Sequence, residues 1–135
     1  MASDGSAHTP GRRPVPFLIT SSRDGDAPIW HLSGELDLAT ALDLEATFEA
    51  WRDSIASPVA VITLDLSGLS LIDSTGVRAL VRVASAHEVQ RVVLRDPTDL
   101  VQRVFQLVRL GDDPKIEIRT PSLSREIPPG PAPTR

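Results

Sequence analysis

Residues 59–66, VAVITLDL, form a nearly unbroken apolar run that is rich in β-branched side chains. Such a run is typical of a central strand that is covered on both faces of a sheet. Four shorter stretches also have strand character, at residues 17–23, 29–34, 91–95 and 115–119. The first two are joined by DGDAP, which supplies an Asp-Gly hairpin turn, so an antiparallel pair is expected to open the fold.

Helical periodicity occupies the segments between the later strands. The first helix follows a turn at GELD (34–37), and Thr40 with Asp43 three residues later has the spacing of a capping box. The second helix is expected to begin near Ser74. In these two helices the apolar positions at helical spacing are Ala41, Leu44, Phe48 and Trp51, then Val77, Leu80, Val81 and Ala84.

A third helix is expected after Asp96 and Pro97, which suit the N-cap and the first helical turn, and before Gly111, which suits a C-terminal stop. Its apolar positions are Leu100, Val101, Val104, Leu107 and Val108. The order is therefore β-β-α-β-α-β-α-β. This order predicts an α/β fold with a mixed sheet that opens with an antiparallel hairpin, has parallel crossovers later, and carries helices packed on the sheet.

The length of 135 residues fits one domain, which we place at residues 16–120. Residues 1–15 are polar, and residues 121–135 are rich in proline, so both are expected to be disordered tails. A C-terminal helix at SLSREI is expected to be one turn or absent.

Composition excludes several classes of protein. The net charge of −4 argues against direct binding of nucleic acid, and the absence of cysteine excludes a disulfide framework and a cysteine-based zinc site. Neither a signal peptide nor an apolar run of about 18 residues is present, so a cytoplasmic protein without a membrane segment is expected. No cofactor or metal is predicted.

Three polar side chains and a glycine, Asp73, Ser74, Thr75 and Gly76, separate an apolar run from the second helical pattern. One interpretation is a helix cap, because serine and aspartate oxygens accept the unpaired N–H groups of a first turn. Glycine, however, costs roughly 0.5–1 kcal/mol relative to alanine inside a helix. A close-approaching partner or a phosphate would explain a bare backbone at Gly76.

Ser74 is a poor candidate for a catalytic nucleophile. The sequence has no Gly-x-Ser-x-Gly elbow, and a general base would have to be His8, His31 or His87. His8 lies in the expected tail, His31 within a strand, and His87 near the end of the second helix. None of the three is placed convincingly.

Two further interpretations, an aspartic protease and a phosphorylated receiver domain, have little support in the sequence. An aspartic-protease motif needs Asp-Thr/Ser-Gly in direct succession, whereas an extra residue follows Asp73 here. A receiver domain needs an acidic pair near its first strand, but Asp24 and Asp26 are turn residues. Ser74 is better interpreted as the substrate of another enzyme, because a phosphate at a helix N-terminus is compatible with the fold.

The segment LSGELDLATA (32–41), followed about thirty residues later by ITLDLSGLSLIDSTGVRAL (62–80), resembles the STAS domains of anti-sigma factor antagonists. The resemblance covers nearly all of residues 17–119. It implies a non-enzymatic partner switch, in which the unphosphorylated protein binds an anti-sigma factor serine kinase and thereby releases a sigma factor. The kinase then phosphorylates a serine that matches Ser74, and a PP2C-type phosphatase restores the active form.

The resemblance also suggests which side chains face the partner. Asp37 matches an acidic position on the kinase-facing surface of the family. Arg78 and Arg82 lie one turn apart on the polar face of the second helix, as solvated residues or as partner contacts. Besides the phosphorylated Ser74, the expected partner-binding residues are Asp37, Asp73, Thr75, Gly76 and Arg78.

Two functional hypotheses remain open at this stage. The first is the phosphorylation-controlled antagonist, acting as a monomer or weak homodimer. The alternative is a STAS scaffold subunit of a larger signalling assembly, or a STAS module that binds a small ligand. In the last case Gly34, Gly76 and the N-terminus of the second helix would hold a phosphate.

Overall fold

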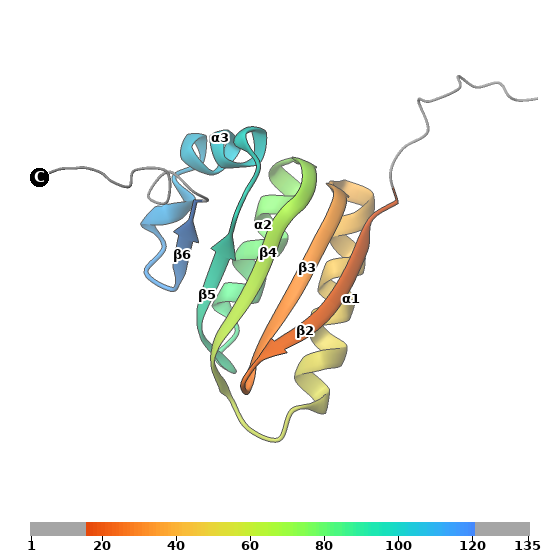
Figure 1. The fold of residues 1–135 in the computed structure, drawn as a ribbon, viewed down its shortest axis with the longest axis vertical. Helices are drawn as coiled ribbons and strands as arrows, with labels where there is room; N and C mark the ends of the chain where they lie inside the picture. The colour runs from red at the N-terminus through yellow and green to blue at the C-terminus, as the bar shows by residue number, and fades with distance from the viewer. Residues whose placement is uncertain (1–15, 121–135) are drawn as a thin grey trace, which may run out of the picture.

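The computed structural model describes residues 16–120. The expected tails, and with them the possible C-terminal helix, lie outside the described residues. The elements, labelled as in Figure 1, are β2 (Leu18–Asp24), β3 (Ala27–Leu36), α1 (Leu38–Ser54), β4 (Val59–Ile72), α2 (Ser74–Ser85), β5 (Val89–Arg95), α3 (Asp99–Leu107), the 3₁₀ turn η1 (Leu110–Asp112) and β6 (Ile116–Arg119).

The strands form one five-stranded sheet in the order β2-β3-β4-β5-β6. The opening hairpin is antiparallel, and the other three pairings are parallel, which confirms the predicted mixed sheet and element order. Gly25 in the hairpin turn has a φ of +64°, a conformation that glycine adopts without strain. Strands β3, β4 and β5 end at the same edge of the sheet, and α1, α2 and α3 begin there (Figure 1).

The sheet is covered on one face, and the prediction that the central strand is covered on both faces was wrong. In residues 16–120, α1 and α2 lie together behind the sheet (Figure 1). Side chains of β4 alternate accordingly: Ile62, Leu64 and Leu66 are fully buried, whereas Thr63 and Asp65 are half-buried on the other face. The core between sheet and helices is apolar, and no polar or charged side chain of the described residues is fully buried in it.

Ion pairs and hydrogen bonds cross the open face of the sheet at Asp65. Oδ2 of Asp65 lies 2.8 Å from Nδ1 of His31 and 3.5 Å from Nη2 of Arg95, on the two neighbouring strands. Oδ1 accepts the backbone N–H of Ser67 at 3.0 Å. Burial acts to raise the pKa of the Asp65 carboxyl. The hydrogen bonds from Ser67 and His31 and the charge of Arg95 outweigh burial, so this pKa lies below its ordinary value.

Asp65→Asn is expected to lower the free energy of unfolding by about 1 kcal/mol at neutral pH. A carboxyl with a lowered folded-state pKa stabilises the fold above its unfolded-state pKa, near pH 4, and loses that effect as the pH falls through the folded-state value. The difference between wild type and variant should therefore shrink as the pH falls below about 4. Urea unfolding between pH 3 and pH 7 measures it, with Asp24→Asn on the exposed end of β2 as the matched control. A constant difference across this range would contradict the assignment.

The third helix begins later than predicted. Asp96 has a φ of +57° and donates its N–H to Arg119 O at 2.8 Å, so it ends β5 instead of capping α3. The N-cap is Thr98, whose Oγ1 accepts the N–H of Val101 and donates to Leu69 O. At the other end α3 stops at Leu107, before the stop expected at Gly111, and Arg109 takes the left-handed conformation with a φ of +57°.

Candidate functional site

The two sequence motifs meet at the edge where β3 and β4 end. Leu36 and Ile72 are paired in the parallel register, so Asp37 and Asp73, the next residue on each strand, start α1 and α2 side by side. The backbone N–H of Asp73 donates to Leu36 O at 3.2 Å. One hydrogen bond thus joins the end of GELD to the start of DSTG. In the structure Gly34, Glu35 and Leu36 belong to β3, so the turn predicted at 34–37 is limited to Asp37.

Gly76 is buried against the end of β3, which corrects the idea that it leaves room for a partner or a phosphate. A Cβ atom at this position would lie 2.5 Å from Leu36 O and 2.8 Å from Ile72 Cγ1. The bare backbone is therefore required by contact within the chain. Gly76 is buried in the described chain and positions α2 against β3, and its role in partner binding stays a prediction.

Asp73, and not Ser74, caps α2. Its Oδ1 accepts the N–H of Gly76 at 2.9 Å, and its carbonyl accepts the N–H of Val77 at 2.9 Å. Ser74 is the first residue of α2, its side chain is exposed, and its hydroxyl forms no hydrogen bond with residues 16–120. Because capping is done by its neighbour, the Ser74 hydroxyl is available for chemistry. Thr75, the next residue, is half-buried.

Asp37 forms the capping box of α1, so the box predicted at Thr40 and Asp43 lies three residues too late. Oδ1 of Asp37 accepts the N–H groups of Ala39 and Thr40 at 3.0 and 3.1 Å, and the Asp37 N–H donates to Thr40 Oγ1. The hydrogen bond from the Thr40 N–H is the main cause of a lowered pKa at Asp37. The carboxylate is therefore held ionised at the surface, beside α2.

The other expected groups are placed as follows. Arg78 is exposed one turn after Ser74, without an ion pair to residues 16–120, whereas Arg82 pairs with Glu45 on α1 at 2.9 Å.

His31 bonds to Ser22 and Asp65 on the sheet, and His87 is exposed next to Glu88, so neither histidine hydrogen-bonds to Ser74. His8 lies outside the described residues. Within residues 16–120 no cluster of three or more His, Asp or Glu side chains could hold a metal ion.

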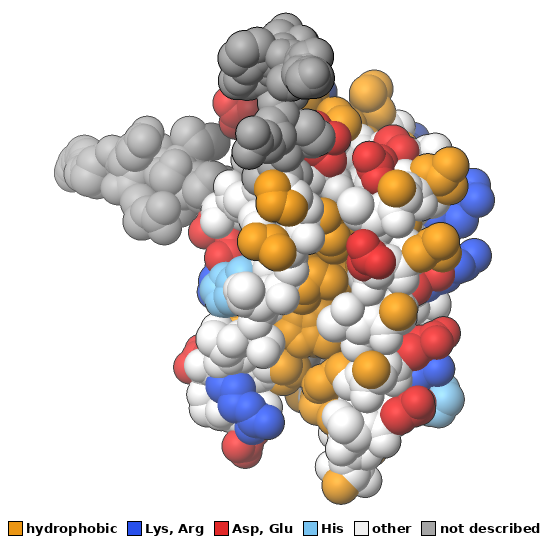
Figure 2. Space-filling view, turned by 90° about the vertical axis from the view of Figure 1, so that its right-hand side faces the viewer, with side chains coloured by type: hydrophobic (Ala, Val, Ile, Leu, Met, Phe, Trp, Pro, Cys, Tyr) orange, Lys and Arg blue, Asp and Glu red, His pale blue; other side chains and the backbone are white. Residues whose placement is uncertain are grey.

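Sequence reasoning missed an exposed apolar patch next to this site. Leu38 and Leu42 on α1 are 70% and 67% exposed, and Leu71, just before Asp73, is 38% exposed. Figure 2 shows hydrophobic side chains on this upper part of the molecule, among acidic and basic groups. The signal in the sequence was the pair of leucines at i and i+4 that fall outside the buried stripe of Ala41, Leu44 and Phe48. Leu71 pairs with Glu35 and points away from the buried Ile72, toward the open face of the sheet, so we call only Leu38 and Leu42 the apolar rim.

Several solved structures share the fold of this chain. An anti-sigma factor antagonist from Mycobacterium paratuberculosis is 23% identical, with 82% of this chain and 90% of that chain covered and a TM-score of 0.61. The anti-sigma factor antagonist SpoIIAA in its unphosphorylated form is 24% identical, with 82% and 94% covered and a TM-score of 0.57. Bacillus SpoIIAA in the phosphorylated form is 22% identical, with 82% and 97% covered and a TM-score of 0.52.

A search among curated proteins found no match. No helix in the described part of the chain is both long and apolar enough to cross a membrane. A family model described as "Mlab, STAS domain" matches residues 19–120, which include every strand and helix from β3 to β6 and both motifs of the site. The chain therefore belongs to the STAS domain family.

Proposed function

We propose that this protein is an anti-sigma factor antagonist that works as a phosphorylation-controlled partner switch. With Ser74 unphosphorylated it binds an anti-sigma factor serine kinase in the cytoplasm, as a monomer or weak homodimer, and a sigma factor is released. It acts by binding and has no catalytic activity of its own. The observation that carries this proposal is the exposed, unbonded hydroxyl of Ser74 at the start of α2, beside the ionised Asp37.

The surface around Ser74 has the composition of a protein interface. The apolar rim provides area that water does not solvate well, and Asp37 and Arg78 provide charges of opposite sign at its border. Similarity to structures of SpoIIAA in unphosphorylated and phosphorylated forms supports a switch that operates without a change of fold. A PP2C-type phosphatase would complete the cycle by removing the phosphate.

The phosphate itself is compatible with the free domain. It would lie at the N-terminus of α2, where the helix dipole favours negative charge by roughly 0.3–1 kcal/mol. Arg78 follows Ser74 by four residues on the same helix, so its guanidinium is within reach of the phosphate. In a complex, however, the same dianion must be desolvated inside an interface that fits a hydroxyl.

The test of the modified residue is incubation with an anti-sigma factor serine kinase and ATP, followed by tandem mass spectrometry. We expect the phosphate on Ser74 and not on Thr75, because Ser74 is exposed and Thr75 is half-buried. Ser74→Ala should abolish incorporation, and Thr75→Ala should retain it. A modified Thr75 with an unmodified Ser74 would refute the assignment.

Asp37→Asn is expected to weaken kinase binding by about fivefold, or roughly 1 kcal/mol, with little loss of stability. Asparagine caps a helix about as well as aspartate, so the variant removes the charge and keeps the cap of α1. Asp37→Ala should lose binding and also about 0.5–2 kcal/mol of stability. Calorimetric titration and thermal melting separate the two effects. Full affinity of the asparagine variant would remove Asp37 from the partner surface.

Leu42→Glu is expected to weaken kinase binding by at least about tenfold, because it puts an unpaired charge into a contact that should be apolar. The matched control is Leu107→Glu on α3, a leucine that is 79% exposed and lies outside the apolar rim. Both variants should melt like the wild type. Equal effects of the two substitutions on affinity would contradict a specific role of the rim.

A second candidate function stays open because the matching family model is described as "Mlab, STAS domain", which does not mention an anti-sigma factor antagonist. In that case the domain would be a STAS scaffold subunit of a larger assembly. Native mass measurement of the protein purified from its own cells distinguishes the two: a large stable particle supports the scaffold, whereas a monomer or weak dimer supports the switch.

A further inference from the structure

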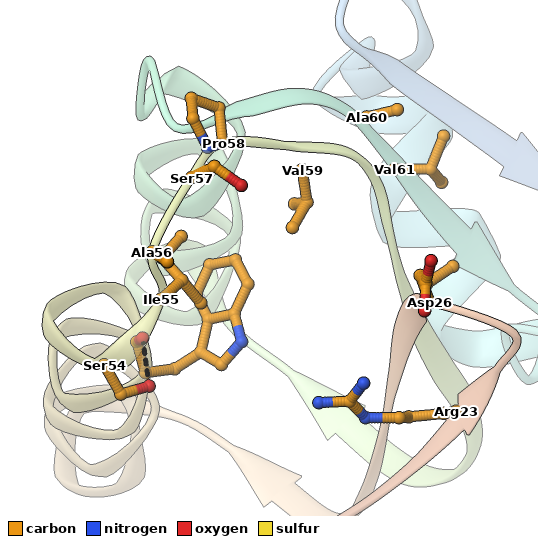
Figure 3. Close-up of a pocket in the computed structure, with 12 residues that line it drawn as sticks. Arg23, Asp26, Ser54, Ile55, Ala56, Ser57, Pro58, Val59, Ala60 and Val61 are labelled. Atoms are coloured by element: carbon orange, nitrogen blue, oxygen red, sulfur yellow. Dashed lines mark hydrogen bonds between the residues drawn. The ribbon is translucent and has the colours of Figure 1, made fainter.

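We propose that a groove at the opposite end of α1 from Asp37 binds a small organic anion with an aromatic or alkyl body. The groove has a volume of about 750 Å³ and lies between the C-terminal end of α1, the loop 55–58, the start of β4 and the β2–β3 hairpin (Figure 3). This volume is within the usual range for small-ligand sites, about 300–1,000 Å³.

Two of the side chains that line this groove carry hydrogen-bond donors without partners in residues 16–120. Arg23, on β2, directs its guanidinium into the groove and forms no ion pair or side-chain hydrogen bond with the described residues (Figure 3). Trp51, on α1, also lines the groove, and its indole N–H has no acceptor there. A guanidinium binds carboxylate, sulfonate or phosphate through charge-assisted hydrogen bonds, so the two donors together favour an anionic head group.

Arg23 reaches this position because the helix layer ends before it covers β2. Arg23 is paired with Pro28 in the hairpin and points to the same side of the sheet as the buried Trp30. Figure 2 shows the resulting strip of hydrophobic surface between β2 and α1, with basic side chains at its lower end. A ligand in the groove would thus continue the apolar core outward and present its charge to Arg23.

The walls of the groove are suited to an apolar ligand body. Ile55, Pro58 and Val59 line it along the loop 55–58 and the start of β4 (Figure 3). Trp51 is held in place by edge contact with Trp30, with ring centroids 5.8 Å apart, and by Phe48 at 5.5 Å. This fixed indole provides a preorganised wall, which reduces the entropy cost of binding. Among the described residues that line the groove, Asp26 is the only acidic one. It lies on the hairpin, across the groove from Ile55 (Figure 3), so the anionic head group is expected at Arg23 on the side away from Asp26.

The test uses two probes of nearly the same shape, anionic 8-anilinonaphthalene-1-sulfonate and neutral N-phenyl-1-naphthylamine, each titrated into the full chain by fluorescence. The sulfonate should bind at a single site and at least about tenfold more tightly than the neutral probe. In the presence of the sulfonate, signals in the ¹H–¹⁵N spectrum of the protein should shift at Arg23, at the indole N–H of Trp51 and along residues 54–60. Shifts confined to another apolar surface, such as Leu107 and Val108 on α3, would overturn the proposal.

Arg23→Gln should reduce the affinity for the sulfonate by at least about tenfold and leave the affinity for the neutral probe unchanged. The matched control is Arg103→Gln on α3, which makes the same change of net charge at an exposed site outside the groove. Equal loss in both variants would mean attraction by net charge alone and would refute the site. No residue of the groove belongs to the surface around Ser74, so this outcome is independent of the proposed partner switch.

Discussion

Phosphorylation of Ser74 is expected to lower the affinity for the anti-sigma factor kinase by at least about a hundredfold, or roughly 2.7 kcal/mol, while the melting temperature stays nearly constant. The loss has a local cause. The hydroxyl is exposed at the start of α2, and a partner that covers this surface must remove water from whatever Ser74 carries. A hydroxyl loses little in that step, whereas a phosphate with a charge of about −1.5 to −2 loses much.

Constant stability is the distinguishing part of this expectation. Asp73 caps α2 through its own carboxylate, so a modification of Ser74 removes no hydrogen bond from the fold. Calorimetric titration with the kinase should be combined with thermal melting of the phosphoprotein, the wild type and Ser74→Ala. The Ser74→Ala variant should bind the kinase and melt like the unmodified wild type. A sharp drop in melting temperature would indicate a switch by local unfolding. Unchanged kinase affinity of the phosphoprotein would refute the partner switch itself.

Gly76→Ala is expected to lower the free energy of unfolding by about 2–3 kcal/mol, although alanine is the better helix former by about 1 kcal/mol. The added Cβ would lie 2.5 Å from the backbone carbonyl oxygen of Leu36, the last residue of β3, which is buried and paired with Ile72 of β4 and so cannot move aside cheaply. Either α2 shifts away from β3, or the hydrogen bond between Asp73 and Leu36 breaks. Both outcomes also displace Ser74 from Asp37.

Thermal and urea unfolding measure this effect, and a decrease of roughly 10–20 °C in melting temperature is expected for a domain of this size. Gly111→Ala is the matched control, because a Cβ there meets only Ile118 Cδ1 at an ordinary 3.7 Å. The control should be neutral or slightly stabilising. If Gly76→Ala were equally well tolerated, the close contact would not be required, and partner binding would be the remaining explanation for a glycine at this position.

The element order was predictable because each strand and helix has its own periodicity in the sequence. Coverage of the sheet was not predicted correctly, since VAVITLDL was interpreted by its overall apolar character. Thr63 and Asp65 alternate with Ile62 and Leu64, and this alternation was the sign of an open face. The capping box of the first helix was misplaced for a related reason. The pairs Asp37–Thr40 and Thr40–Asp43 have the same spacing, and only the three-dimensional path of β3 selects the Asp37–Thr40 pair.

The candidate site was partly predictable for a topological reason. Parallel neighbouring strands end at one edge, so two motifs that follow β3 and β4 must lie close together. The contact of Gly76 with Leu36 O, the apolar rim and the groove at Arg23 were not predicted. Each depends on residues distant in sequence or on where the helix layer stops, and neither spacing nor composition contains that information.

In the proposed partner switch, the hydrogen bond from Asp73 to Leu36 also bears on how two copies of such a protein diverge after gene duplication. The bond makes the relative position of Asp37 and Ser74 depend on how the buried side chains of Leu36 and Ile72 pack. A conservative change at either core position would move one half of the recognition surface against the other, with every exposed residue unchanged. Through such changes in buried residues, each of two paralogues in one cell could stop binding the partner of the other. Alignments of surface residues alone would not detect this difference.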